Sequence, residues 1–236
     1  MTILKPKALI FDVFGSLVDW RTGVGNYCQT VFEEKSIKQD PLEFADFWRA
    51  EYQPAMNKIR SGNRGYIPLD ILHRENLNVI LDHTGHASQF SEVERISLNH
   101  AWEHLPPWPD VLEGLSRIRK KALIAPCSNG SIALMLRLAR YAHFNWDAIL
   151  GADIAKDYKP KPDVYLASCA ALGLEPKEVM MVAAHNNDLE AARDSGLMTA
   201  FFPRPTEYGD SQTEDLEASE NWDIVAENLV DLANKI

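Results

Sequence analysis

The sequence predicts an α/β protein with a doubly wound parallel sheet and a helical cap subdomain inserted after the first strand. Two observations support this fold class. Short, continuously apolar runs alternate with helical patterns over residues 110–202, and a long helical stretch separates them from the first apolar run. Continuous apolar runs are typical of parallel strands buried on both faces. We therefore predict a core domain of residues 1–17 and 102–236 and a cap of residues 18–101.

The first predicted strand lies in the segment KALIFDVFGSLVDW, residues 7–20. β-Branched and aromatic residues precede Asp12, and Gly15-Ser16 ends the run, which places Asp12 at the carboxyl edge of the strand. Apolar residues then recur at helical spacing through the predicted cap. The segment Leu-Pro-Pro-Trp-Pro at residues 105–109 cannot continue a helix and is predicted to be the hinge that leads back to the core.

Helices and strands alternate after the hinge, as expected for a Rossmann-like core. Helices are predicted over residues 110–121, 132–141, 164–172, 189–195 and 224–235, and strands over 122–127, 148–151, 179–184 and 199–202. Ligands of such sheets bind outside the carboxyl ends of the strands. A cleft between core and cap is therefore expected at the edge that holds Asp12, whereas the tail from Pro203 to Ile236 is predicted to carry no chemistry.

Composition excludes several classes of function. The formal net charge is −10, from 24 Lys and Arg against 34 Asp and Glu, so a nucleic-acid partner is not expected. The excess of negative charge also repels an anionic substrate, so a site for such a substrate needs local cationic groups. The three cysteines are far apart and odd in number, as in a reduced cytoplasmic protein. The first apolar run is too short for a signal or membrane segment, so no membrane partner is expected.

Polar side chains follow four predicted strands. They are Asp12 and Ser16; Ser128 and Asn129; Lys159 and Lys161; and His185, Asn187 and Asp188. Each group also has a structural interpretation, as a turn, a surface loop or, for Asp188, the N-cap of the next helix. Because all four groups are predicted at one edge of the sheet, we favour an active site.

The segments FDVFGSLVDW, CSNGS, YKPKPDVY and VAAHNNDLEAA resemble the four motifs of the haloacid dehalogenase superfamily, in order and across essentially the whole chain. The cap segment DFWRAEYQ, which contains Arg49, resembles the signature of the L-2-haloacid dehalogenases. The resemblance implies hydrolysis of small (S)-2-haloacids or haloacetates to 2-hydroxy acids. It also implies a homodimer that needs neither a metal ion nor another cofactor.

The same resemblance assigns roles to individual residues. Asp12 is the nucleophile that forms an ester with the substrate, and Lys159 keeps it ionised. The other roles are halide binding by Arg49 and Asn129, substrate binding or orientation of Asp12 by Ser16 and Ser128, and orientation of Lys159 by Tyr165 and Asp188. Asp188 is also expected to position or activate the water that cleaves the ester.

Phosphatases of the same superfamily are the first alternative. Their general acid would stand at Phe14, which cannot transfer a proton and is predicted to be a pocket wall or a core aromatic. One of their magnesium-binding carboxylates would stand at Ala184, so a magnesium site would be incomplete. A catalytically idle binding protein is the second alternative, and the retention of Lys159, Arg49 and Asn129 argues against it.

The fourth motif departs from the family pattern S-S-N-x-W-D. His185 replaces the Asn, Ala183 replaces the first Ser, and Asn187 stands where a Trp usually walls the substrate pocket. We hypothesise that His185 donates to the halide or positions water and, being bulkier than Asn, contracts the halide pocket. A tighter pocket favours a small halide that accepts strong hydrogen bonds, which makes fluoroacetate a candidate substrate besides chloroacetate. The alternative is a structural histidine with satisfied hydrogen bonds.

Overall fold

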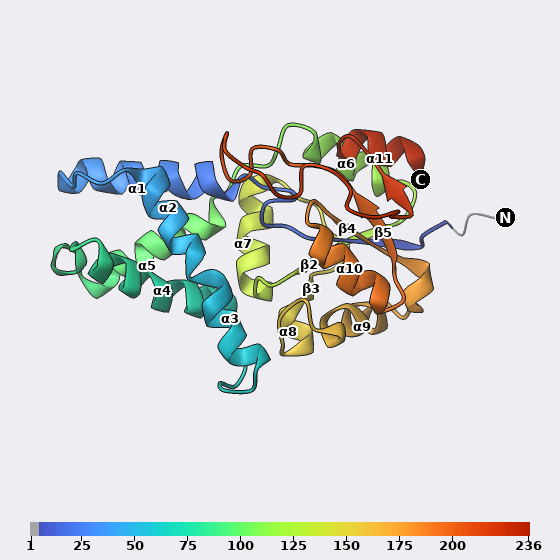
Figure 1. Cartoon of the computed structure of the whole chain (residues 1–236), viewed down its shortest axis with the longest axis horizontal. Helices are drawn as coiled ribbons and strands as arrows, with labels where there is room; N and C mark the ends of the chain where they lie inside the picture. The colour runs from blue at the N-terminus through green and yellow to red at the C-terminus, as the bar shows by residue number, and fades with distance from the viewer. Residues whose placement is uncertain (1–4) are drawn as a thin grey trace.

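A six-stranded parallel sheet forms the centre of the computed structural model, which describes residues 5–236 (Figure 1). The strand order is β3-β2-β1-β4-β5-β6. The strands are β1 (Ala8–Phe11), β2 (Leu123–Ser128), β3 (Leu150–Gly151), β4 (Val179–Ala183), β5 (Met198–Phe201) and β6 (Ile224–Val225). The predicted doubly wound α/β fold is confirmed.

Helices cover both faces of the sheet because alternate residues of the central strands point to opposite sides. Leu9 and Phe11 of β1 join one apolar cluster, and Ala8 and Ile10 join another. The first cluster contains residues of α6 (Val111–Ile118), α7 (Ile132–Ala142) and α11 (Leu229–Lys235). The second contains residues of α9 (Pro162–Ala171) and α10 (Asn186–Asp194), while the short α8 (Ala152–Ala155) follows β3.

The chain between β1 and α6 is helical, and no strand interrupts it in the described part of the chain. Its α-helices are α1 (Trp20–Lys35), α2 (Pro41–Ala50), α3 (Tyr52–Arg60), α4 (Leu69–His83) and α5 (Glu92–Asn99), with the 3₁₀ helices η1 (Ala87–Gln89) and η2 (His100–Glu103). These helices extend beyond one end of the sheet in Figure 1. The domain limits at 17/18 and 101/102 stay a prediction.

The first apolar cluster continues from the sheet into the inserted helices, where it includes Trp48 and Trp102. The hinge segment packs against the loop after β1, because Trp108 donates from its indole Nε1 to the Gly15 carbonyl at 2.8 Å. The insertion is thus held against the edge of the sheet at which β1 ends.

One predicted element is wrong at its start. The helix expected over residues 224–235 begins at Leu229, where Asn228 caps it by accepting from the Asp231 amide. Ile224 and Val225 instead pair with β5 as the edge strand β6. A two-residue strand is too short for a period to be read from its sequence. A further helix, η3 (Pro176–Glu178), precedes β4. None of the helices in residues 5–236 has the length and hydropathy that crossing a membrane requires.

Candidate active site

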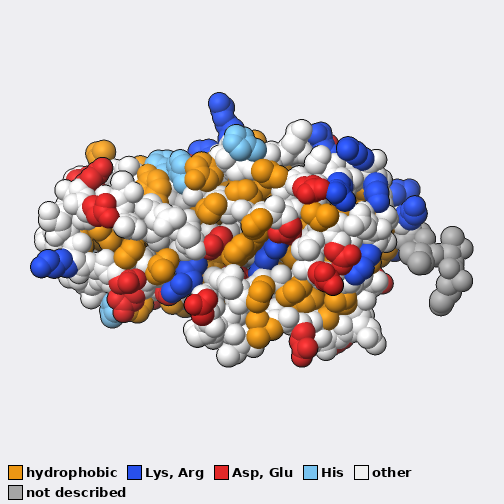
Figure 2. All heavy atoms as spheres, turned by 90° about the horizontal axis from the view of Figure 1, so that it is seen from above, with side chains coloured by type: hydrophobic (Ala, Val, Ile, Leu, Met, Phe, Trp, Pro, Cys, Tyr) orange, Lys and Arg blue, Asp and Glu red, His pale blue; other side chains and the backbone are white. Residues whose placement is uncertain are grey.

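A cavity of about 820 Å³ opens between the inserted helices and the carboxyl ends of the strands. The inserted helices contribute Arg49, Tyr52, Gln53, Asn57 and Arg60, and the core contributes Asp12, Asn129, Lys159, His185, Asn187 and Asp188. The cleft that the sequence predicts is therefore present. The face shown in Figure 2 carries both acidic and basic side chains, and several of the basic ones gather towards its right-hand end.

Lys159 connects two buried carboxylates at the floor of this cavity. Its Nζ lies 2.9 Å from Asp12 Oδ1 and 2.5 Å from Asp188 Oδ2, while Tyr165 donates to Asp188 Oδ1 at 2.5 Å. Asp12 follows β1, Asp188 lies in the first turn of α10, and Lys159 precedes α9. The position between the two carboxylates is thus occupied by an ammonium group, which supplies the positive charge that two adjacent anions require.

The second oxygen of Asp12 accepts from two further donors. Ser16 Oγ lies 2.7 Å from Asp12 Oδ2, and His185 Nδ1 lies 3.0 Å from it. The Ala184 amide donates to Ser16 Oγ at 2.9 Å, which leaves the hydroxyl hydrogen free to point at Asp12. Ser16 therefore orients Asp12, which is one of the two roles expected for it.

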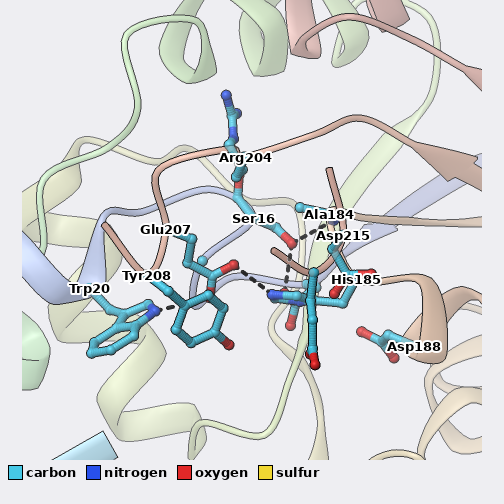
Figure 3. Close-up of polar contacts among 12 residues, drawn as sticks. Ser16, Trp20, Ala184, His185, Asp188, Arg204, Glu207, Tyr208 and Asp215 are labelled. Atoms are coloured by element: carbon cyan, nitrogen blue, oxygen red, sulfur yellow. Dashed lines mark hydrogen bonds and ion pairs between the residues drawn. The ribbon is translucent and has the colours of Figure 1, made fainter. Parts of the chain in front are cut away.

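Glu207 completes the site from a segment in which no chemistry was predicted. Its Oε2 lies 2.8 Å from His185 Nε2, and its Oε1 accepts from Trp20 Nε1 at 2.9 Å (Figure 3). The side chain is 1% exposed. The prediction that the tail after Pro203 lacks chemistry is wrong. The position of Glu207 in the chain could have identified it, because its segment follows β5 at the same carboxyl edge of the sheet as the other four groups.

Burial and neighbouring charges shift the ionisation of these groups. Burial would raise the pKa of Asp12, but Lys159 and His185 outweigh it and hold that pKa well below its usual value. Burial raises the pKa of Asp188, and the Asp12 charge adds to this rise. Burial would lower the pKa of His185, yet Glu207 and Asp12 raise it well above the ordinary value. The site therefore contains one strongly ionised carboxylate beside a more basic one.

Arg49, from the inserted helices, and Asn129, from the core, both line the cavity and both contact Tyr52. The Arg49 guanidinium stacks 4.0 Å from the centre of the Tyr52 ring, and its Nη1 has no hydrogen-bond partner among residues 5–236. Asn129 donates from Nδ2 to the Tyr52 hydroxyl at 3.1 Å and accepts the Lys159 amide at 2.8 Å. Arg49 thus offers a free donor, whereas both ends of the Asn129 amide are already engaged.

The other predicted site residues divide into two groups. Phe14, Asn187 and Lys161 line the cavity. Ser128 and Tyr165 are completely buried and are not part of its lining. Ser128 accepts the Gly130 amide at 3.0 Å, so its hydroxyl stabilises the turn after β2, and the predicted contact with Asp12 is not formed. The N-cap interpretation of Asp188 is wrong, because His185 occupies the N-cap position of α10.

No group of three or more histidine, cysteine or carboxylate side chains lies together as metal ligands in residues 5–236. The three cysteines are free and buried, as the sequence predicts.

Comparisons with known proteins find mainly haloacid dehalogenases, although a phosphoglycolate phosphatase of Thiobacillus denitrificans is also 29% identical over 91% of this chain and 91% of its own. A family model of haloacid dehalogenase-like hydrolases matches residues 6–196. The structure of the defluorinating L-2-haloacid dehalogenase Rha0230 is 46% identical, with a TM-score of 0.96 over 98% of this chain and 94% of its own. That of the L-2-haloacid dehalogenase PA0810 is 43% identical, with a TM-score of 0.94 over 98% of both chains. The (S)-2-haloacid dehalogenase 4A of Burkholderia cepacia is 26% identical over 96% of this chain and 98% of its own.

Proposed function

The chain belongs to the haloacid dehalogenase-like hydrolases and, within them, to the L-2-haloacid dehalogenases, which act on carbon–halide bonds, and on this premise we propose its reaction. The enzyme converts small (S)-2-haloacids or haloacetates to 2-hydroxy acids through an ester of Asp12. The observation that supports this most directly is the buried ion pair between Asp12 Oδ1 and Lys159 Nζ at 2.9 Å. It keeps the carboxylate ionised in a cavity that a small organic acid can enter.

In the first step a carboxylate oxygen of Asp12 attacks C2 of the substrate. A carbon–oxygen bond forms, the carbon–halogen bond breaks, and the halide leaves with the electron pair. Halide needs no proton to depart, so the position of a phosphatase general acid can be taken by Phe14. Arg49 Nη1, which has no hydrogen-bond partner within residues 5–236, is the donor we assign to the departing anion.

In the second step a water molecule attacks Cγ of the ester. Asp188 takes its proton, which the raised pKa of this carboxyl favours. The bond between Cγ and the Asp12 oxygen that attacked C2 breaks, and this oxygen leaves in the hydroxy acid, which takes the proton from Asp188. The water oxygen stays on Cγ and its remaining proton is released, so Asp12 returns to a carboxylate. The overall reaction consumes one water and releases halide and one proton.

His185 bears on the choice of halide through its size. Both of its ring nitrogens face carboxylates, Asp12 and Glu207, so neither is free to donate to halide. The steric part of the hypothesis remains: an imidazole in place of an Asn contracts the site and favours a small halide. The defluorinating relative makes fluoroacetate the substrate to test first. Fluoride and chloride release by the enzyme and by His185→Asn measure this, and an unchanged ratio would contradict it.

Two assays test the proposed function. Halide release from 2-chloropropionate in EDTA is expected for the enzyme and is expected to disappear in Asp12→Asn. Turnover of p-nitrophenyl phosphate with Mg²⁺, in the absence of halide release, would instead indicate a phosphatase. A protein that releases neither halide nor phosphate would be the catalytically idle binding protein.

The homodimer is proposed on the family resemblance alone, and the cytoplasmic location on the three free, buried cysteines. Light scattering of the purified enzyme tests the oligomeric state, and fractionation of the producing cells tests the compartment.

A further inference from the structure

The hydrogen bonds of Asp12 distinguish its two oxygens. Among residues 5–236, Oδ1 accepts from Lys159 only, whereas Oδ2 accepts from both Ser16 and His185. A carboxylate oxygen has about two lone-pair sites, so Oδ1 keeps one for attack and Oδ2 has none to spare. If Oδ1 forms the bond to the substrate, Oδ2 becomes the carbonyl oxygen of the ester.

This assignment fixes where negative charge develops in the second step. When water adds to Cγ of the ester, the electron pair of the carbonyl bond moves onto Oδ2. Oxyanion-hole donors lie about 2.7–3.1 Å from the atom that takes up the charge. Ser16 Oγ at 2.7 Å and His185 Nδ1 at 3.0 Å satisfy this geometry. Both donors are in place before the reaction begins, since the neighbouring Ala184 amide orients the Ser16 hydroxyl.

We propose that His185, as an imidazolium held by Glu207, is a catalytic residue of ester hydrolysis that forms an oxyanion hole with Ser16. The proposal rests on the proposed function, because it concerns the second step of that reaction. Carboxylates only accept hydrogen bonds, so the two ring nitrogens that face Asp12 and Glu207 are both donors. The ring is therefore doubly protonated, and Glu207 is the positioning residue that keeps it so.

Glu207 is itself fixed on several sides. Trp20, the first residue of α1, donates to its second oxygen, and the backbone of Gly15 lies so close that an added Cβ would be 2.0 Å from Oε1. The turn that presents it begins at Arg204, whose Nε donates to the Ser16 carbonyl at 2.8 Å (Figure 3). The Glu207 carboxylate therefore contacts both the loop after β1 and the first inserted helix. These contacts hold it in place beside His185.

The test separates the two chemical steps. Rapid-quench measurement of halide gives the rate of ester formation, and intact-protein mass spectrometry follows the ester of Asp12 as it forms and decays. The variant is Glu207→Gln, and the matched control is Glu190→Gln, which makes the same change at an exposed position of α10. Both are measured with 2-chloropropionate between pH 6 and pH 9.

In Glu207→Gln we expect the halide burst to persist and ester hydrolysis to slow by about 100- to 1000-fold, the usual cost of losing one oxyanion donor. The ester then accumulates. The loss in hydrolysis rate relative to the unaltered enzyme becomes smaller as the pH falls, because acid protonates the imidazole that Glu207 no longer keeps protonated. The control keeps both rates. Hydrolysis at the unaltered rate, or an equal loss of both steps, would overturn the proposal.

A measurement on the unaltered enzyme covers the case in which the variant does not fold. The ¹⁵N resonances of the His185 ring are expected to show two protonated nitrogens at pH 8, with assignment by comparison with His185→Gln. A singly protonated ring at that pH would refute the oxyanion-hole role even where halide is released. Failure of the unaltered enzyme to release halide from any haloacid would instead refute the proposed function, and with it the step assigned here.

Discussion

Replacing Gly15 by alanine tests whether the loop after β1 is shaped around Glu207. Gly15 has φ of +90°, in the left-handed region that favours glycine. An ideal Cβ at this position would lie 2.0 Å from Oε1, 2.3 Å from Cδ and 2.6 Å from Oε2 of Glu207. Real contacts of this kind stay above 3.0 Å, so Gly15→Ala has to displace the Glu207 carboxylate.

Two costs add to give the expected magnitude. A non-glycine residue in the left-handed region costs about 1–2 kcal/mol. Displacing Glu207 breaks its hydrogen bonds to Trp20 at 2.9 Å and His185 at 2.8 Å, and a bond to a charged group contributes about 1.5–3 kcal/mol. At the low end of these ranges, the free energy of unfolding falls by about 4 kcal/mol.

Urea denaturation followed by circular dichroism measures this loss, and Gly173→Ala is the matched control. Gly173 also has a positive φ, +67°, but no described atom lies within 4 Å of its ideal Cβ. The control therefore loses only the backbone contribution, about 1–2 kcal/mol. If Gly15→Ala loses no more stability than Gly173→Ala, Glu207 is not held against Gly15 and the reasoning fails.

Three further predictions concern the charged groups. Lys159→Met leaves Asp12 and Asp188 without their shared cation, so we expect the halide burst at pH 7 to vanish and stability to fall by about 3–5 kcal/mol; a normal burst in rapid-quench assays would contradict this. Arg49→Lys keeps the charge but loses the guanidinium donors, so the rate of ester formation in the same rapid-quench assay should fall by about 100-fold. An unchanged rate would show that Arg49 does not bind the departing halide. The raised pKa of His185 means that its contribution to stability is complete below pH 6.5 and is lost as the pH rises through the higher folded value. His185→Asn should therefore flatten the fall in unfolding free energy between pH 7 and pH 10, and parallel curves for the two proteins would contradict it.

Much of the site could be predicted because the chemistry follows from topology. Parallel strands end at one edge of the sheet, so polar residues after different strands meet there although they are distant in sequence. Asp12, Lys159 and Asp188 are separated by up to 176 positions, yet Lys159 bonds to both carboxylates. Asp188 had a competing local interpretation as a helix cap, which the structure excludes because His185 occupies the N-cap position and Asp188 bonds to Lys159.

The remaining features depend on contacts that a local pattern does not encode. Glu207 follows a Pro-Arg-Pro segment that is typical of an exposed tail, and its burial depends on Trp20 and Gly15 from the opposite end of the chain. Ser128 has the residue type expected of a ligand, but the nearby Gly130 amide uses its hydroxyl. Strand β6 exists only as a partner of β5. In each case the partner, not the residue type, determines the role.

Glu207 and His185 also balance the charge of the site through the proposed reaction. At rest, three buried carboxylates face three cations: Asp12, Asp188 and Glu207 against Lys159, His185 and Arg49. Binding of an anionic haloacid makes the total −1, and departure of the halide returns it to zero because Asp12 has become a neutral ester. When Asp188 takes the proton of the attacking water, it becomes neutral as Oδ2 becomes negative, so the total stays at zero. With a neutral His185, the same intermediate would be a net anion in a buried site, which desolvation disfavours. A protonated His185 therefore stabilises the hydrolytic step even though the chain as a whole has a net charge of −10.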